Sequence, residues 1–369
     1  MSEKSAAAAA CPPNSMRQQP VPAVGARSLS VEIWGAEIPA GLLLAAEQTV
    51  DTPYACLAYV RAYQPELIPR LQHAVARHCG ELVAIVSFYA RSRSLVVVNR
   101  LLRFPDQVLN ACVAAMLEQN PAARSVEFTE LYNEERAHAA ACSLTWRTID
   151  CVAAELPASY GEYLEHFGAA TRKNLRYCAR RLERDAPAVS FNIHRREAIS
   201  ASMIAAVVQL NHQRMAFKGG RSGIDESYAA RLATLSRSHG VACIATDGAA
   251  VVAGALCTEV GSGWTLHVIA HDPQFNHVRL GLLCLLKAVE EAIACGAARF
   301  NFLWGLGDYK LLFGGTVSAL RARRYYRDSG TRLLALADMR DFTVQSLRRH
   351  VSLWRRGLKK RAHSPRPHT

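Results

Sequence analysis

Long apolar runs are missing from this sequence of 369 residues. No stretch approaches the roughly 18 apolar residues that a membrane-spanning helix needs, and the longest one, residues 248–257, has the length of a buried strand. Charged residues make up 20% of the chain and hydrophobic residues 50%. A chain of this composition buries enough apolar surface to offset its ordering entropy, which excludes disorder throughout. The length suits about two domains.

Cys-x-x-Cys pairs are missing as well. The 11 cysteines are scattered, and most lie in apolar stretches. This usage is typical of a reducing compartment, where a cysteine behaves as a small core residue. The segment before Cys11 is too short and too weakly apolar for the hydrophobic region of a signal peptide. We therefore expect a cytoplasmic protein with a disordered leader over residues 1–28.

Several nucleotide-binding and metal-binding patterns are also missing. The chain has no Gly-x-x-x-x-Gly-Lys-Ser/Thr loop, no Gly-x-Gly-x-x-Gly fingerprint and no nucleophile elbow. His267, His271 and His277 lie close together in sequence. Positions four apart on an extended strand are nevertheless about 13 Å apart, and no nearby cysteine or glutamate completes a ligand set. We expect no metal.

Two series of strands and helices are present instead. The first has strands at residues 31–34, 82–90, 94–101 and 125–131, with helices at residues 69–79 and from Asp106 onward. The second has strands at residues 241–245, 251–259, 264–270 and 299–303, with a helix at residues 281–295. The helices that begin at Asp106 and Gly281 are about 175 residues apart, and the strands after them keep nearly that offset. This layout predicts an α/β fold (α+β mixed sheets) of two structurally repeated domains.

A basic helix separates the two series. Residues 171–185 carry six cations against Glu183 and Asp185. The cations are Arg172, Lys173, Arg176, Arg180, Arg181 and Arg184. Another helix is expected around Tyr160, and a strand at residues 189–194 and a helix at residues 198–217 follow.

The strand at residues 264–270 leads through a loop into the helix that begins at Gly281. Such a unit presents unpaired backbone N–H groups and the positive end of the helix dipole, which suits a pyrophosphate or another anion. Most strand–loop–helix units bind nothing, so both readings stay open. The next strand runs into FNFLWGLGDYKLLFGG, residues 300–315. There Tyr309 can act as a general acid, or it packs its ring and hydrogen-bonds locally.

Taken together, residues 171–185, 210–220, 272–281 and 300–315 resemble the CelD-like acyltransferases. These belong to the GNAT superfamily and are related to the Fem-type aminoacyltransferases. The resemblance covers residues 159–328 clearly and the N-terminal repeat only by layout. It implies two tandem GNAT-like acyltransferase domains, the second of which binds acetyl-CoA or another acyl-CoA as the donor substrate. The domains would span residues 29–158 and 188–335, with basic interdomain helices at residues 159–187.

The resemblance also implies roles for individual residues. The backbone from His277 to Leu282 would hold the pyrophosphate of CoA, and Tyr309 would protonate the departing thiolate. The pyrophosphate segment consists of His277, Val278, Arg279, Leu280, Gly281 and Leu282. Asp308 and Lys310, beside the tyrosine, would contact the substrate. Leu306 and Gly307 stand where family members commonly have acidic residues, and Asn301 stands where an Asp is common, so the sequence departs from the family pattern in that turn.

A base is needed to deprotonate an attacking amine, and acceptor contacts are expected beside it. His271, Asp272 and Glu259 are the candidate bases, and His271 is of the residue type that titrates near neutral pH. The acceptor or the CoA phosphate would contact Arg214, Arg172 and Lys173, which the resemblance places near the acceptor site. Each of these has a plain alternative, namely a loop histidine without a role, a solvated helix-end arginine, or a solvated basic face.

The last segment is basic and amphipathic. Residues 342–369 contain eight Lys and Arg and no acidic residue, so they supply +8 of the net charge of +13 and leave +5 for the other 341 residues. An apolar stripe predicts a basic C-terminal helix and tail over residues 336–369, which either docks on the protein or lies on an anionic membrane surface. Its members are Val344, Leu347, Val351, Trp354 and Leu358. Nucleic acid is not expected as a partner, because no binding motif is present.

These features lead to one main functional hypothesis and two alternatives. The main one is an acyl-CoA-dependent N-acyltransferase that moves an acyl group, most simply acetyl, to an amine by direct attack in a ternary complex. Family analogy alone suggests that the amine belongs to a sugar or another glycan or cell-envelope precursor, as in polysaccharide biosynthesis. The alternatives are Fem-type aminoacyl transfer from tRNA and a non-catalytic, membrane-associated binding protein. The expected location is the cytoplasm, with peripheral contact at the inner face of the membrane as an option.

Overall fold

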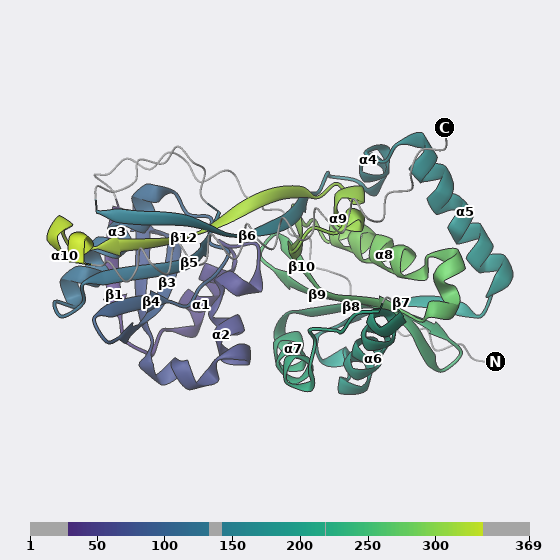
Figure 1. Ribbon diagram of the computed structural model, residues 1–369, viewed down its shortest axis with the longest axis horizontal. Coiled ribbons are helices and arrows are strands. Elements are labelled where there is room, and N and C mark those ends of the chain that lie inside the picture. The colour runs from purple at the N-terminus through teal and green to yellow at the C-terminus, as the bar shows by residue number, and fades with distance from the viewer. Residues whose placement is uncertain (1–28, 133–141, 218, 335–369) are drawn as a thin grey trace. The chain divides into compact units, whose positions relative to one another are not determined.

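The computed structural model describes residues 29–132, 142–217 and 219–334 (Figure 1). The expected leader over residues 1–28 and the expected basic C-terminal helix over residues 336–369 lie outside this part. None of the helices in the described ranges has the length and apolar character that a bilayer crossing requires.

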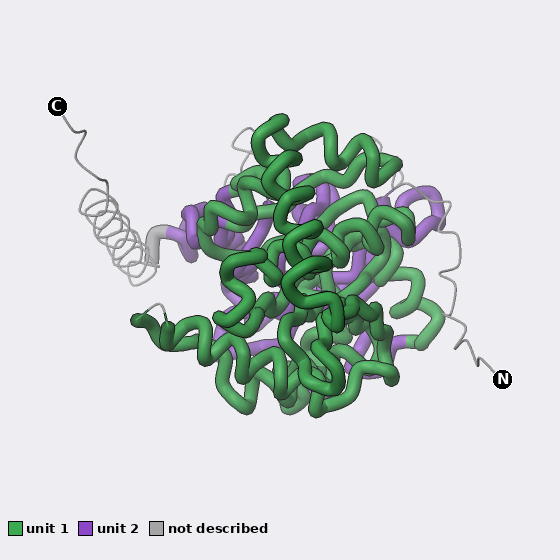
Figure 2. The backbone as a smooth tube through the Cα atoms, turned by 90° about the vertical axis from the view of Figure 1, so that its right-hand side faces the viewer, with its two compact units in different colours: residues 1–24, 39–68, 151–318 green, residues 25–38, 69–150, 319–369 purple. Residues whose placement is uncertain are grey.

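The described chain divides into two compact units, each built from separate segments (Figure 2). Unit 1 contains residues 39–68 and 151–318, and unit 2 contains residues 29–38, 69–150 and 319–334. These units differ from the continuous domain ranges expected from the sequence. Residues 39–68 belong to unit 1, together with residues 151–318. The strands β6 (Ser143–Glu155) and β12 (Thr316–Tyr326) each contribute residues to both units.

Unit 2 is a mainly antiparallel sheet with one long helix. Its strand order is β1-β2-β3-β4-β5-β12-β6, in which β4 and β5 are parallel and the pairs β1–β2, β2–β3, β3–β4 and β5–β12 are antiparallel. The strands are β1 (Leu29–Trp34), β2 (Gln72–His78), β3 (Glu81–Arg91), β4 (Ser94–Val97) and β5 (Ser125–Leu131), completed by parts of β12 and β6. The helix α3 (Asp106–Gln119) makes the crossover that a parallel pair requires. Its buried residues are those of the expected apolar stripe, namely Val108, Leu109, Cys112, Val113, Met116 and Leu117. The short helix α10 (Ser329–Leu334) ends the unit.

The prediction of a helix at residues 69–79 is wrong. The chain forms the 3-10 helix η3 (Pro65–Arg70) and then strand β2, which pairs with β1 and β3. Residues 73–76 are all buried, so β2 is covered on both of its faces. A strand buried on both faces is continuously apolar, and a short apolar run of this kind does not distinguish a strand from a helix.

Unit 1 contains the sheet that carries the candidate site. Its strand order is β6-β11-β10-β9-β8-β7, with β10 and β11 parallel and the other neighbours antiparallel. The strands are β7 (Val189–Arg195), β8 (Gly240–Asp247), β9 (Ala250–Val260), β10 (Gly263–His271) and β11 (Arg299–Trp304), together with the end of β6. All five of these match strands expected from the sequence, to within three residues at each end.

Two apolar layers cover this sheet, because alternate residues of each strand point to opposite faces. In β8, Cys243 belongs to one buried cluster and Ile244 to the other. The first cluster includes helices α4 (Tyr160–Glu165), α5 (Ala169–Asp185) and α8 (Leu280–Ala294). The second includes α6 (Ala201–Phe217) and α7 (Glu226–His239). Figure 1 shows α8 and α6 on opposite sides of the strands.

Residues 39–68 form a segment of unit 1 that the sequence did not predict. It contains α1 (Ala40–Glu47), the 3-10 helix η2 (Pro53–Ala55) and α2 (Leu57–Tyr63). The Tyr63 ring lies edge-on to Tyr228 of α7, with centroids 6.0 Å apart. Tyr54 is only 2% exposed and lies edge-on to Trp304 at the end of β11. This early segment is therefore part of the core around β10 and β11.

Candidate active site

The parallel strands β10 and β11 pair over three residues only. The paired positions end at Thr265 and Asn301, although β10 continues to His271 and β11 to Trp304. Both strands carry an irregularity just beyond this point, β10 between Leu266 and Val268 and β11 between Asn301 and Leu303. We call this parting of the strands the β10–β11 fork. Backbone groups on its inner edges have no ladder partner within the described sheet, so they can serve a ligand.

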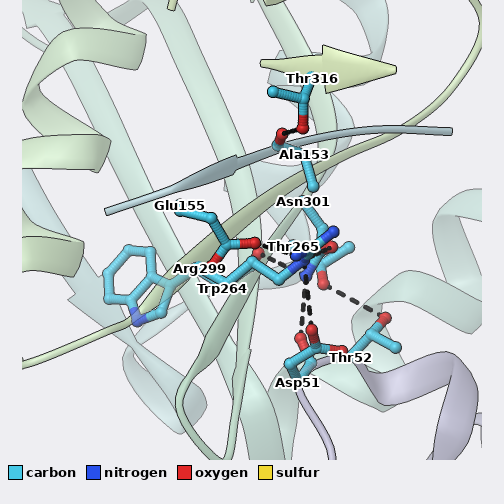
Figure 3. Close-up of polar contacts among 9 residues, drawn as sticks. All are labelled: Asp51, Thr52, Ala153, Glu155, Trp264, Thr265, Arg299, Asn301 and Thr316. Carbon is cyan, nitrogen blue, oxygen red and sulfur yellow. Dashed lines mark hydrogen bonds and ion pairs between the residues drawn. The ribbon is translucent and has the colours of Figure 1, made fainter. Parts of the chain in front are cut away.

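A buried polar network closes the base of the fork (Figure 3). The Arg299 side chain is 7% exposed, forms an ion pair with Asp51 at 3.2 Å and also contacts Glu155. Arg299 Nε donates to Asn301 Oδ1 at 3.1 Å, and Asn301 Nδ2 donates to the backbone carbonyl of Asp51 at 2.9 Å and to that of Trp264 at 3.3 Å. Because its charges and donors find partners inside the unit, the network holds β10, β11 and the 39–68 segment together.

Close backbone approach accompanies this network. A Cβ atom on Gly263 would lie 2.0 Å from the carbonyl oxygen of Asp51, a distance that no side chain tolerates. Only glycine allows the β9–β10 turn to touch the 39–68 segment in this way.

The loop from β10 to α8 is held by its own side chains. Asp272 Oδ1 accepts from the Gln274 amide at 2.9 Å and caps the 3-10 helix η5 (Pro273–Val278). Arg279 then adopts a left-handed conformation at φ 53° and forms the N-cap position of α8, without a side-chain cap. The first amides of a helix have no partner within it, so this end of α8 offers N–H groups and a positive dipole.

The six residues expected at the pyrophosphate all lie at this turn, yet their side chains differ in environment. Val278, Leu280 and Gly281 are buried, Leu282 is half-buried, and His277 and Arg279 are exposed. His277 Nδ1 is 2.8 Å from the carbonyl oxygen of Gln274. Contact with an anion could therefore come from the backbone of the whole turn but from only two of the side chains.

His271 and Asp272, two of the expected bases, both brace the loop. His271 Nε2 lies 2.9 Å from Asn276 Oδ1, and a Cβ atom on Gly281 would come within 2.6 Å of His271 Nδ1. The imidazole is thus packed between the loop and the start of α8. Glu259, the third candidate, forms an ion pair with Arg195 at 2.8 Å.

Tyr309 lies just beyond the end of β11. Tyr309 belongs to the short helix α9 (Asp308–Leu312), is half-buried, and lies edge-on to Phe302 with centroids 6.4 Å apart. Burial raises the pKa of its phenol, and the positive charge of Arg214 acts in the opposite direction. The phenol is therefore protonated at neutral pH, as a general acid must be. Asp308, next to it, is exposed in the first turn of α9.

Lys310, expected at the substrate, is placed differently. Its side chain is buried, and Nζ donates to the backbone carbonyls of Phe302 at 2.7 Å, Leu303 at 3.3 Å and Trp304 at 2.7 Å. An ammonium group has three donors, and these contacts use all of them. Burial lowers the pKa of Lys310 to about 8. Through these hydrogen bonds, Lys310 stabilises the irregular end of β11, next to Tyr309 in the chain.

Arg172 and Lys173 lie on α5 rather than beside Tyr309. Arg172 donates to the carbonyls of Phe167 at 2.8 Å and Glu165 at 3.2 Å, so it caps the end of α4. Lys173 is exposed to solvent. Of the residues expected at the acceptor, Arg214 is the one whose charge acts on the pKa of Tyr309.

One histidine near the fork was considered from the sequence only as a metal ligand. His267 lies at the irregularity in β10, and its Nε2 is 2.9 Å from Thr258 Oγ1. Burial lowers the pKa of His267 to about 3, so the imidazole is neutral at ordinary pH. Its Nδ1 has no hydrogen-bond partner among the described residues. Within those residues, no group of three or more His, Cys, Asp or Glu could hold a metal ion.

Comparison with known proteins agrees with this geometry. Residues 169–311 match the family model described as acetyltransferase (GNAT) domain. This part of the chain is therefore similar to the GNAT acetyltransferase domain. The matched segment runs from the start of α5 into α9 and includes the fork, the loop before α8 and Tyr309. No curated protein matches the sequence closely enough to be significant.

Solved structures are similar to this chain over most of its length. The superposition with the crystal structure of FemX covers 82% of this chain and 99% of FemX. The two are 10% identical and have a TM-score of 0.58, which shows a shared fold. L-PGS from Bacillus licheniformis covers 85% of this chain and 98% of its own, with 13% identity and a TM-score of 0.47. The superposition with a tandem GNAT protein from the clavulanic acid biosynthesis pathway covers 80% of this chain and 98% of that protein, with 11% identity and a TM-score of 0.39. The expected mixed α/β fold class of GNAT type is confirmed.

Proposed function

We propose that this protein is an acyl-CoA-dependent N-acyltransferase. The observation that carries the proposal is the β10–β11 fork, with the N-terminus of α8 following one strand and Tyr309 following the other. The fork exposes backbone N–H groups that can polarise a thioester carbonyl. The turn before α8 fits a pyrophosphate, and Tyr309 follows the end of β11, as a leaving-group acid would require.

The residues divide the chemistry in the following way. The nitrogen of the acceptor amine attacks the thioester carbonyl, so that a C–N bond forms and the C–S bond breaks. Tyr309 gives its proton to the departing sulfur and regains one from solvent. The surplus proton of the amine passes to His271, while Asp272 shapes the loop that carries it. Acetyl is the simplest acyl group for this reaction.

The acceptor is proposed to be an amine on a sugar or another glycan precursor that carries an acidic group. Arg214 is the basis for proposing the acidic group, because its positive charge acts on Tyr309 and would attract an anionic acceptor. Asp308 is exposed on the same short helix and would contact the amine before transfer. Lys310 would act indirectly, by holding the end of β11 through its hydrogen bonds to backbone carbonyls. Arg172 and Lys173 would contact the acceptor only if the acceptor extends to α5.

Aminoacyl transfer from tRNA is the second candidate, and one observation favours it. The helix α5 exposes Lys173, Arg176, Arg180 and Arg184, which together form a basic surface suited to a polyanion. The fold shared with FemX supports the architecture that both candidate functions require, and it does not distinguish between them.

Acetyl-CoA binding and one variant test the proposal. At about 100 times its dissociation constant, acetyl-CoA should stabilise the protein by roughly 2.7 kcal/mol in thermal unfolding. Tyr309→Phe should bind acetyl-CoA normally but lose about 10²–10⁴ in the rate of CoA release in the presence of amino sugars. Tyr177→Phe, at a residue 52% exposed on α5, is the matched control and should be unchanged. Stabilisation by tRNA and not by acetyl-CoA would favour the second candidate instead.

A further inference from the structure

A cavity of about 600 Å³ lies beside the sheet of unit 1, between α5, α8 and β7. None of its lining residues belongs to β10, β11, α9 or the turn before α8, so it is separate from the fork. Its size is within the range of small-molecule sites in proteins.

Apolar side chains from five parts of the chain make up most of the wall. They are Tyr160 and Leu164 of α4, Leu175, Ala179 and Leu182 of α5, Ala186 and Pro187 of the next turn, Val189 and Phe191 of β7, and Leu283 and Leu286 of α8. Protein interiors are close-packed, and voids larger than a water molecule are few. An apolar space of this size is therefore suited to an apolar occupant rather than to water.

The charges at the rim are unevenly distributed. Lys287 and Glu290 neutralise each other at 2.8 Å. Arg172 and Arg176, one turn apart on α5, have no carboxylate within ion-pair distance among the described residues, and the contacts of Arg172 are with neutral carbonyls. Glu183 lies seven residues after Arg176, or about 10 Å along the helix. One end of the cavity is therefore cationic, and the apolar wall extends away from it.

We propose that this cavity binds a single aliphatic chain whose anionic head group pairs with Arg172 and Arg176. The chain would lie along the apolar wall between α5 and α8. The head group is anionic because the two guanidinium groups at that end are not neutralised by the protein. A free fatty acid and a single-chain anionic lipid share this chemistry. The site does not depend on the proposed acyl transfer.

Calorimetric titration of the full chain with monomeric dodecanoate tests the proposal. We expect saturable binding with one site per chain. Decanoate, which is shorter by two methylene groups, should bind roughly 15-fold more weakly. Dodecyltrimethylammonium has the same tail and the opposite charge, so it should bind at least about tenfold more weakly than dodecanoate. Equal binding of the two head groups would overturn the charge assignment.

A tighter affinity for dodecanoyl lysophosphatidylglycerol than for dodecanoate would assign the source to a lipid, and the reverse order would assign it to a free acid.

Two variants act on different parts of the cavity. Ala179→Phe fills the space and should abolish binding, and Arg176→Gln should weaken dodecanoate about tenfold without touching the core. Arg180→Gln makes the same charge change on the same helix outside the cavity and should bind as the wild type does. Thermal unfolding shows whether each variant is folded. Unchanged binding in both Ala179→Phe and Arg176→Gln, or displacement of dodecanoate by acetyl-CoA, would overturn the proposal.

Discussion

Asn301 and Asp51 are 250 positions apart in the chain, yet the Asn301 amide donates to the Asp51 backbone carbonyl at 2.9 Å. The same amide group accepts from Arg299, which in turn faces the Asp51 carboxylate. This contact joins the 39–68 segment to the base of the β10–β11 fork. Unit 1 therefore depends on residues that precede the matched segment by more than 100 positions.

Substitution Asn301→Ala should destabilise unit 1. It leaves the carbonyls of Asp51 and Trp264 without this donor, and leaving buried groups unpaired costs about 1–3 kcal/mol in the free energy of unfolding. Urea unfolding measures this loss. Asn192→Ala, on an exposed position of β7, is the control and should change stability by less than about 0.5 kcal/mol. Limited proteolysis should also cut the variant faster within residues 39–68. Equal cleavage rates in the variant and the wild type would contradict the proposal that Asn301 holds this segment against the fork.

Gly281→Ala should strain the start of α8 through His271. The added methyl group would approach His271 Nδ1 to 2.6 Å, so the imidazole must move and its contact with Asn276 is disturbed. We expect a loss of about 1–3 kcal/mol in urea unfolding, typical of overpacking. The double variant Gly281→Ala with His271→Ala removes the opposing atom, and its loss should be smaller than the sum of the single losses. Strict additivity would show that the two residues do not press on each other.

Lys310 should give the protein a distinct pH dependence. Burial lowers the pKa of its ammonium from 10.5 to about 8, so between these pH values the unfolded chain holds a proton that the folded chain has released. This difference makes the free energy of unfolding rise with pH in that window, and the cost of burying the charge is fully present below about pH 8. The stability of the wild type relative to Lys310→Met should therefore increase from pH 8 toward pH 10.5.

Urea unfolding across this pH range measures the effect of Lys310. Other titrating groups are common to both proteins, so they cancel in the difference. Lys173→Met, at an exposed position, should run parallel to the wild type. A Lys310→Met curve that is also parallel to the wild type would show that the Lys310 ammonium is not held in the buried state described above.

Strong local periodicity explains which elements could be predicted. The helix α8 has an apolar stripe over four turns, and the strands β8 to β11 are separated by glycine-containing turns or by α8, so each was located to within a few residues. Strand β2 was mistaken for a helix because both of its faces are buried. The strand β12 has exposed and buried residues in mixed order, so it shows no clear period and was not predicted.

The candidate site was predictable in part for the same reason. Tyr309 and the turn before α8 follow directly from strands that the pattern reveals, so their place at the ends of β10 and β11 could be expected. The burial of Lys310 against three carbonyls could not be expected, because a lysine in a polar turn is ordinarily solvated. The effect of the Arg214 charge on the pKa of Tyr309 depends on where α6 lies against the sheet, which no local signal reports.

The sequence by itself determined the strands β7 to β11 and the helices α5, α6 and α8, but not α7 or α9, because apolar spacing and glycine turns act over a few residues. It also predicted Tyr309 and the turn before α8 as parts of the candidate site. Only the tertiary structure decided that residues 39–68 close the base of the fork, that His271 braces the start of α8, and that a cavity with a cationic end lies beneath α5. These features arise from contacts between residues distant in the chain, whose partners are chosen by packing and by the pairing of buried charges rather than by local pattern.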